Sequence, residues 1–305
     1  MNSTASVCAI ALCGLSFLAQ RPAPTVSPGD FTLSVNVDLV LFNVSVTDKK
    51  GRVAPGLSRG NFTVTEDGTP QEIRQFYAED TPATVGLVID NSGSMVSKRS
   101  DVIEAAFEFV GGSNPQDELF LVNFNDHVSM GLPETTPFAN NSPAIRDALF
   151  QIKAIGKTAL YDGIAQALRH LEKGSLQKKA LVVLSDGGDN ASHRTLKDVL
   201  HMAEESRATV YTIGFFDSYQ TDSHPKVLRQ LAKLTGAESY VVHNVEGLEK
   251  IWQRIAGGIR SQYTLGYIST NPNRDGSFRN VKISAVDKEG KPLQIRARTG
   301  YLAAK

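Results

Sequence analysis

The chain has 305 residues, of which 41% are hydrophobic and 21% are charged. These proportions are typical of a folded protein and exclude a disordered or fibrous one. Its 32 basic and 32 acidic residues give no formal net charge, so no global field draws the chain to nucleic acid or anionic lipid. The length favours two structural units.

An apolar stretch over residues 7–19 precedes a polar, proline-rich segment. Its length suits the core of a signal peptide and is too short to span a bilayer. We therefore predict a signal peptide over 1–23, a linker over 24–30, and a secreted, periplasmic or cell-surface protein with no membrane insertion after processing. The alternative is a buried N-terminal strand or helix, because no Lys or Arg precedes the stretch. Both cysteines, Cys8 and Cys13, lie in it, so a processed chain would contain no thiol.

The segment 31–80 carries strand signals only. Apolar residues alternate along 31–46, which is the period of a β-strand. The parity changes between Leu39 and Phe42, which indicates either a bulge or a strand centre buried on both faces. The pair Asp67-Gly68 marks a hairpin turn. We expect this segment to form the first part of a β-sandwich.

From 82 to 260, apolar strands alternate with helical periods. We expect strands at 84–90, 118–124, 179–186, 208–215 and 239–242, and helices at 101–110, 143–155, 159–171, 196–206, 226–234 and one ending near Ile259. Strands that are apolar on both faces and separated by helices predict an α/β domain with a doubly wound, mainly parallel, Rossmann-like sheet. Ligands bind such sheets at the carboxyl ends of the strands.

The segment 262–303 returns to strands, with turns at Asp275-Gly276 and Glu289-Gly290. Neither strand-only segment has enough strands to bury a face alone. We therefore predict that 31–80 and 262–303 pack into one small β-sandwich, in which the α/β domain is inserted or which flanks it.

Oxygen-bearing side chains follow two of the predicted parallel strands. Asp90, Ser92 and Ser94 leave the first strand of the α/β segment, Asp186 ends a later one, and Thr158 stands just before a helix. The carboxyl ends of parallel strands meet at one edge of a sheet, so these side chains are expected to converge. Hard cations such as Mg²⁺ prefer oxygen ligands. The sequence therefore predicts a metal site for Mg²⁺ or Mn²⁺ built from these five residues.

The order strand-Asp-x-Ser-x-Ser, Gly-x-Thr, strand-Asp-Gly resembles the metal-ion-dependent adhesion site of von Willebrand factor A domains and integrin inserted domains. The resemblance implies that Ser92 and Ser94 bind the metal directly, Thr158 directly or through water, and Asp90 and Asp186 largely through water. It also implies an open coordination position that an acidic residue of a protein partner fills. A cation with few anionic ligands attracts such a carboxylate more strongly. The expected function is metal-dependent protein binding or cell adhesion.

The flanks resemble a narrower group. Residues 44–77 and 262–286 are similar to the ends of exported bacterial von Willebrand factor A-related proteins that are abundant in acidobacteria. This resemblance sharpens the expected fold and compartment more than the expected function.

Other interpretations of the same residues stay open. Ser94 and Thr158 could be helix N-caps, and Asp90 and Asp186 could only satisfy turn amides. A Mg²⁺-dependent phosphotransferase with Asp90 as nucleophile would need a second carboxylate two residues later, where Ser92 stands, so we do not expect an enzyme. A third alternative is a structural component of a cell-envelope complex that acts through the sandwich.

Neighbouring residues have ordinary explanations. Asp189 and Asn190 are expected to be polar loop residues, although they could support the metal ligands from behind. Lys98 and Arg99 could shape the rim of the site, but exposed residues in a first helical turn are usually just solvated. Trp252 lies in an amphipathic helical stretch and is expected to pack in the core.

Overall fold

A computed structural model describes residues 39–78, 80–140, 143–151, 153–215, 224–243 and 247–304. All of them lie within one compact unit, Val37–Lys305. The predicted signal peptide, the linker and residues 31–38 fall outside the described residues. None of the helices in the described ranges is long and apolar enough to cross a membrane.

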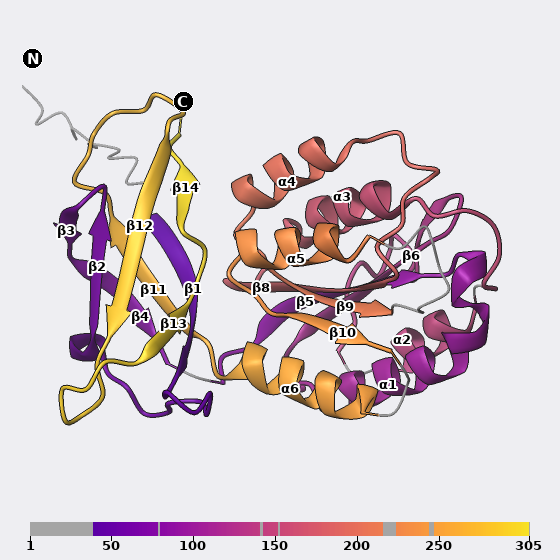
Figure 1. Cartoon of the computed structure of the whole chain (residues 1–305), viewed down its shortest axis with the longest axis horizontal. Helices are drawn as coiled ribbons and strands as arrows, with labels where there is room; N and C mark the ends of the chain where they lie inside the picture. Colours follow the sequence, from indigo (N-terminus) through magenta and orange to yellow (C-terminus); the bar gives the residue numbers. More distant parts are fainter. Residues whose placement is uncertain are drawn as a thin grey trace, which may run out of the picture. The chain divides into compact units, whose positions relative to one another are not determined.

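The flanking segments form two four-stranded sheets (Figure 1). The first has the order β13 (Gln294–Arg296), β1 (Leu39–Thr47), β11 (Tyr263–Ile268), β4 (Ile73–Tyr77). The second has the order β14 (Gly300–Leu302), β12 (Phe278–Ala285), β2 (Phe62–Glu66), β3 (Thr69–Gln71), and a short 3₁₀ helix η1 (Arg59–Asn61) leads into β2. Apolar side chains from both sheets form one buried cluster. The two sheets therefore make a β-sandwich from the N- and C-terminal segments, as predicted.

The centre of β1 explains the parity change in its sequence. Val40, Leu41 and Phe42 are all buried, and the pairing of β1 with β11 runs without a shift from Leu39 opposite Ile268 to Val44 opposite Tyr263. The strand is therefore buried on both faces at this point, which was one of the two expected explanations.

The α/β domain is inserted between two strands of the sandwich. β4 immediately precedes it and β11 immediately follows it, and the two pair antiparallel, with Tyr77 opposite Thr264. The chain thus leaves and re-enters the sandwich at neighbouring strands.

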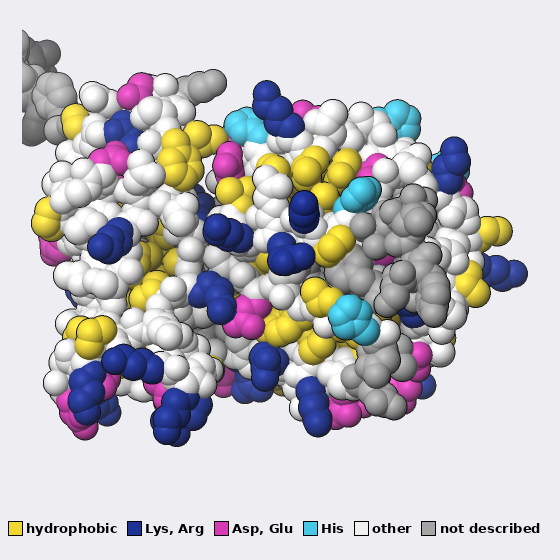
Figure 2. Space-filling model, in the orientation of Figure 1, with side chains coloured by type: hydrophobic (Ala, Val, Ile, Leu, Met, Phe, Trp, Pro, Cys, Tyr) yellow, Lys and Arg dark blue, Asp and Glu magenta, His cyan; other side chains and the backbone are white. Residues whose placement is uncertain are grey.

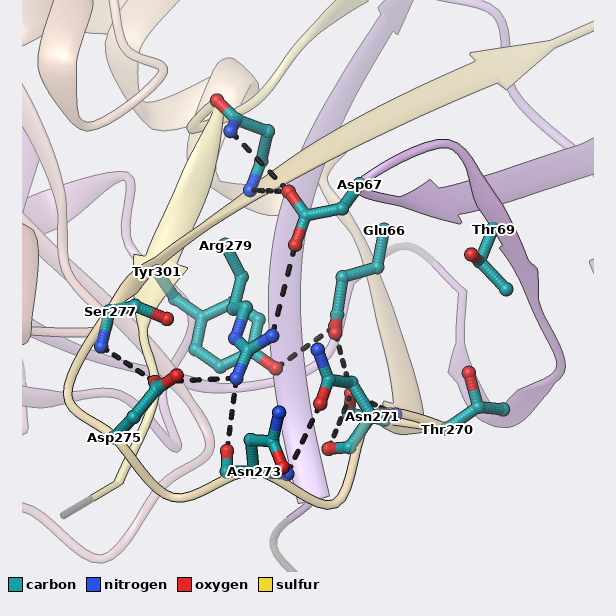
Figure 3. Close-up of polar contacts among 12 residues, drawn as sticks. Glu66, Asp67, Thr69, Thr270, Asn271, Asn273, Asp275, Ser277, Arg279 and Tyr301 are labelled. Atoms are coloured by element: carbon teal, nitrogen blue, oxygen red, sulfur yellow. Dashed lines mark hydrogen bonds and ion pairs between the residues drawn. The ribbon is translucent and has the colours of Figure 1, made fainter.

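A set of polar side chains occupies one end of the sandwich (Figure 3). Glu66, only 2% exposed, accepts hydrogen bonds from the hydroxyls of Tyr267 at 2.8 Å, Tyr301 at 2.9 Å and Ser269 at 2.5 Å. Arg279 is also buried and donates hydrogen bonds to the Asn273 carbonyl oxygen and to the Asp275 carboxylate. Its guanidinium also forms an ion pair with the Asp67 carboxylate at 4.0 Å. We call these residues the sandwich polar network: Glu66, Asp67, Tyr267, Ser269, Asn273, Asp275, Arg279 and Tyr301.

The inserted domain is a doubly wound sheet, as predicted. Its strand order is β10 (Ser239–Val242), β9 (Thr209–Phe215), β8 (Lys178–Ser185), β5 (Ala83–Asp90), β6 (Glu118–Phe124), β7 (Val128–Met130). All neighbours pair parallel except β7, which pairs antiparallel with β6 at the edge. The helices are α1 (Arg99–Gly111), α2 (Pro143–Phe150), α3 (Leu160–Leu171), α4 (Leu196–Glu205), α5 (Pro225–Leu234) and α6 (Leu248–Arg260).

The helices cover both faces of this sheet (Figure 1). One buried cluster joins β5, β6 and β8 to α1, α2 and α6, and a second joins the opposite face to α3, α4 and α5. Trp252 of α6 is fully buried and packs on Phe109, with ring centroids 5.0 Å apart, so it is a core residue. Gly86 is required in β5, because a Cβ atom there would come within 2.3 Å of the Phe120 ring.

The prediction of a helix over 143–155 was too long. α2 ends at Phe150, and none of the described residues between it and the start of α3 is helical. Gly156 has a φ of +85°, which no right-handed helix contains. The Ile155 amide instead donates to the Asn91 carbonyl oxygen at 2.9 Å, and the Ile155 side chain is 64% exposed. The apolar period in the sequence therefore did not mark a buried helical face here.

Candidate metal centre

The first part of the centre is the turn that leaves β5. β5 ends at Asp90, and the 3₁₀ helix η2 (Gly93–Lys98) begins three residues later. The Ser92 amide donates to Asp90 Oδ1 at 2.8 Å, which folds the turn back on the carboxylate. The hydroxyls of Ser92 and Ser94 lie 3.1 Å apart. Asp90, Ser92 and Ser94 thus lie together at the carboxyl end of the central strand.

The second part follows β8, which pairs parallel with β5. Ile89 lies opposite Leu184, so Asp90 meets Ser185 and Asp186 comes directly beyond them. The Ser185 hydroxyl donates to Asp90 Oδ2 at 2.6 Å, and the Ser94 hydroxyl donates to Asp186 Oδ2 at 2.6 Å. The hydroxyls of Ser92 and Ser94 are therefore bonded to each other and to Asp186, while Asp90 is held by the Ser92 amide and the Ser185 hydroxyl.

The third part is the loop before α3. The Gly93 amide donates to the Gly156 carbonyl oxygen at 3.0 Å. The Thr158 amide donates to Asn190 Oδ1 at 2.9 Å, and the Asn190 amide donates back to the Thr158 carbonyl oxygen at 3.0 Å. The backbone of Thr158 is thus tied to the loop after β8, and Gly156 ties the same segment to the loop after β5. Within the part of the chain that the structure describes, no hydrogen bond uses the Thr158 hydroxyl.

Helix capping does not account for these hydroxyls. The N-cap of α3 is Ala159, so Thr158 lies outside the helix. Ser94 lies inside η2, whose N-cap is Ser92, and no side-chain capping bond is made there. The turn-amide interpretation holds in part, since Gly188 donates its amide to Asp186 at 3.1 Å, but it leaves the chain of hydroxyls unexplained.

Three further residues position the centre: Ser185 and Asp126, which the sequence did not single out, and Asn190, which it offered as a polar loop residue or as a support for the metal ligands. The Ser185 hydroxyl donates to the Asp90 carboxylate, and the Asn190 side chain accepts a hydrogen bond from the Thr158 amide. Asp126 accepts a hydrogen bond from the Lys157 amide at 2.9 Å. A Cβ atom on Gly156 would approach the Asp126 carboxylate to 1.9 Å, so only glycine fits there. The Ser-Asp-Gly-Gly-Asp-Asn run offered a weak signal for Ser185 and Asn190, whereas nothing in the sequence linked Asp126 to Gly156.

The electrostatics of the centre are those of carboxylates without a counter-charge. Asp90 is 2% exposed and Asp186 is 7% exposed. Burial raises the pKa of Asp90 to about 6, against hydrogen bonds from Ser185 and Ser92 that lower it, and the charge of Asp186 raises it further. Among the described residues, no Lys, Arg or His forms an ion pair with either carboxylate. Two buried like charges side by side favour a cation between them.

The donor set fits a hard divalent cation. It offers two carboxylates and three hydroxyls, all oxygen, at the carboxyl edge of a parallel sheet, and Mg²⁺ and Mn²⁺ favour such oxygen ligands. Across the described ranges, no group of three or more His, Cys, Asp and Glu side chains is placed to hold a metal ion. Any metal at this edge would therefore depend on the serine and threonine hydroxyls as well as on the carboxylates.

Comparisons with known proteins agree with this fold. The chain is 28% identical over 183 residues to the uncharacterized protein sll0103 of Synechocystis sp., covering 57% of this chain and 42% of that protein. It thus spans less than half the length of this curated relative. A von Willebrand factor type A structure from Catenulispora acidiphila superposes with a TM-score of 0.53 at 14% identity, covering 89% of this chain and 75% of that one.

A second solved structure shares the fold. Proximal thread matrix protein 1 from the mussel byssus, described with a zinc-occupied metal-ion-dependent adhesion site, has a TM-score of 0.51 at 15% identity, covering 64% of this chain and 49% of that one. The model of the von Willebrand factor type A domain matches residues 85–254, which is more than half of the chain. The chain therefore belongs to the von Willebrand factor type A domain family.

Proposed function

We propose that this chain is a protein-binding module whose ligand contact is a divalent cation, Mg²⁺ or Mn²⁺. The observation that carries the proposal is the pair of buried carboxylates, Asp90 and Asp186, each of which accepts a hydrogen bond from a serine hydroxyl and has no cationic partner in the described part of the chain. The zinc in the mussel protein's corresponding site supports metal binding by this fold. An acidic residue of a protein partner would complete the coordination.

In this proposal the chain's residues divide into ligands and supports. Ser92, Ser94 and Thr158 offer hydroxyls to the cation, and Asp90 and Asp186 supply the negative charge that retains it. Ser185 and Asn190 are positioning residues, since they orient Asp90 and Thr158. Bound metal supplies a positive site that a partner's carboxylate can enter. No covalent chemistry is required of the chain.

The proposed setting is outside the cytoplasm. The apolar segment 7–19 supports export through a signal peptide, and an adhesive or assembly role at the cell surface, in the periplasm or in the medium is compatible with it. Detection of the chain in the extracytoplasmic fraction, with a processed N-terminus found by mass spectrometry, would test this part.

Calorimetric titration of Mg²⁺ and Mn²⁺ into the metal-free chain tests the metal itself. Wild type is expected to bind one ion, and Asp90→Ala is expected to bind none while keeping the circular dichroism spectrum of the fold. Asp275→Ala removes a carboxylate from the sandwich polar network and serves as the matched control, with unchanged metal binding. Equal heats from wild type and Asp90→Ala would overturn the proposal.

A further inference from the structure

The three most exposed large apolar side chains in the described ranges belong to two segments beside the candidate metal centre. The large hydrophobic residues with the highest exposure in the described ranges are Ile155 at 64%, Phe150 at 61% and Val96 at 59%, and the next, Val53 in the sandwich, is 45% exposed. Val96 belongs to η2, and the other two flank the loop that leads to Thr158. Exposed apolar groups that gather at one place mark an interaction surface more often than scattered ones do.

Hydrogen bonds hold these two segments side by side. Ile155 donates its amide to the Asn91 carbonyl oxygen at 2.9 Å, and Gly93 donates to the Gly156 carbonyl oxygen at 3.0 Å. The Arg99 guanidinium donates to the Phe150 carbonyl oxygen at 3.4 Å. A 3₁₀ helix rises about 2 Å per residue, so Val96 is only about 6 Å along η2 from Gly93. The backbone segments that carry the three apolar side chains are therefore joined to one another beside the turn that leaves β5.

The same two segments are positively charged. Residues 91–100 contain Lys98 and Arg99, residues 150–159 contain Lys153 and Lys157, and neither stretch contains Asp or Glu. Lys153 and Lys157 are exposed. The nearest carboxylate bonded to this rim is Asp126, which accepts the Lys157 backbone amide. The rim is thus basic as well as apolar, and charge complementarity selects an acidic partner.

In the view of Figure 2, hydrophobic and basic side chains protrude together at the right-hand end of the α/β domain. It is the end at which the parallel strands β9 and β10 finish in Figure 1. We define the apolar-basic rim as Val96, Phe150, Lys153, Ile155 and Lys157.

We infer that the apolar-basic rim binds an extended segment of a protein partner in which the metal-binding Asp or Glu is flanked by bulky apolar side chains and by further acidic residues. This inference rests on the proposed function, because the metal fixes the central carboxylate. The rim then supplies selectivity: apolar neighbours cover Phe150, Ile155 and Val96, and the additional acids face Lys153 and Lys157. A carboxylate in a polar, neutral or basic segment is bound weakly.

Immobilised synthetic peptides test the inference, each with one central Glu and defined flanks. Four kinds of flank are compared: Gly and Ser only; Leu and Phe; Leu and Phe together with Asp; and Leu and Phe together with Lys. A peptide with Gln in place of the central Glu measures the background binding. Binding of the full chain is measured by biolayer interferometry with millimolar Mn²⁺ and again with chelator. We expect chelator-sensitive binding to be about tenfold tighter with the apolar flank than with Gly and Ser, as covering one large side chain implies, and tighter again with Asp.

Variants assign the selectivity to the rim. The double variant Phe150→Ser, Ile155→Ser is expected to reduce the affinity preference for Leu and Phe flanks to below about threefold, because two of the three apolar contacts of the rim are lost. The double variant Lys153→Glu, Lys157→Glu is expected to reverse the preference from Asp flanks to Lys flanks. Val53→Ser and Lys50→Glu, matched exposed changes in the sandwich, are expected to change neither preference. Circular dichroism and Mn²⁺ titration check that each variant is folded and loaded.

The outcomes separate this inference from the proposed function. Chelator-sensitive binding that is equal for all flanks would overturn the rim and leave the metal-dependent function standing. The same holds if the Phe150 and Ile155 variant keeps the full apolar preference. Absence of chelator-sensitive binding to every peptide containing Glu would overturn both, and calorimetry would then show whether the metal site itself is missing.

Discussion

The metal centre of the α/β domain and the sandwich polar network both bury carboxylates, but they neutralise them differently. Glu66 in the sandwich accepts three hydroxyl hydrogen bonds, and nearby Arg279 supplies positive charge to Asp275. Asp90 and Asp186 each accept one hydroxyl and one amide hydrogen bond, and they lie close enough for one charge to raise the pKa of the other carboxyl.

This difference distinguishes a structural network from the proposed binding site. A buried polar network stabilises a fold when each member is satisfied internally. A pair of buried carboxylates that lacks a cation costs stability unless something from outside supplies the charge. The sandwich network is complete by itself, whereas we propose that the candidate metal centre is completed by a cation, and the predictions below test that contrast.

The largest effect is expected from Glu66→Ala in the sandwich. It leaves the hydroxyls of Tyr267, Tyr301 and Ser269 without their acceptor in a buried site, which should cost about 3 kcal/mol of unfolding free energy. Urea denaturation followed by circular dichroism measures the loss. Glu66→Gln, which keeps an acceptor oxygen, should lose less. The loss should be the same with Mg²⁺ and with chelator; a loss that depends on metal would break the contrast.

Asp90→Asn is expected to separate the metal-free state from the metal-bound state. With chelator, the variant should be as stable as wild type or more so, because it removes a buried charge that has no counter-ion. With free Mn²⁺ about a hundredfold above its dissociation constant, wild type should gain about 2.7 kcal/mol, and the variant should gain little. Thermal denaturation in both conditions provides the measurement. A similar gain in both proteins would argue against Asp90 as part of the site.

Asn190→Ala should weaken metal binding without removing a ligand. Its side chain holds the Thr158 amide, and removing such a supporting group commonly lowers metal affinity about tenfold or more. Calorimetric titration with Mn²⁺ measures this change. Asn271→Ala, which removes the acceptor for the Asn273 amide in the sandwich, is the matched control and should bind Mn²⁺ like wild type. Unaltered affinity in Asn190→Ala would mean that the position of Thr158 does not matter to the ion.

Asp275→Ala should have the smallest effect. The Asp275 carboxylate is exposed. The Arg279 guanidinium also donates to the Asn273 carbonyl oxygen at 3.0 Å, so it keeps a hydrogen-bond partner when Asp275 is replaced. We expect a small decrease in melting temperature, well below that of Glu66→Ala, and no change in the response to Mn²⁺. A decrease as large as that of Glu66→Ala would show that Arg279 depends mainly on Asp275.

The predictable features were those that one stretch of sequence determines. The strands around Val85 and Val182 are apolar on both faces and indicated a parallel sheet. Asp90, which ends the first of them, and Asp186, which follows the second, indicated the edge at which a ligand is expected to bind. Thr158 was proposed as a ligand from its position before a helix and from the resemblance to a known motif. These features need only the period of a strand and the geometry of a parallel sheet.

The features that could not be predicted depend on which loops meet. Ser185 faces Asp90 because β5 and β8 are neighbours in a given register, and Asp126 fits only because Gly156 leaves room for it. The prediction of a helix through Ile155 was wrong for the same reason, because the Ile155 amide donates to the Asn91 carbonyl oxygen instead of to a carbonyl within a helix. A period in the sequence carries no information about such a competing partner.

The most direct test is diffraction from crystals of the full chain grown or soaked with Mn²⁺, using the anomalous signal of manganese. We expect one strong anomalous peak among the side-chain oxygens of Asp90, Ser92, Ser94, Thr158 and Asp186, and its loss in Asp90→Ala crystals. Continuous density for these loops with no peak among them, or a peak elsewhere that survives in Asp90→Ala, would contradict a metal-dependent binding site.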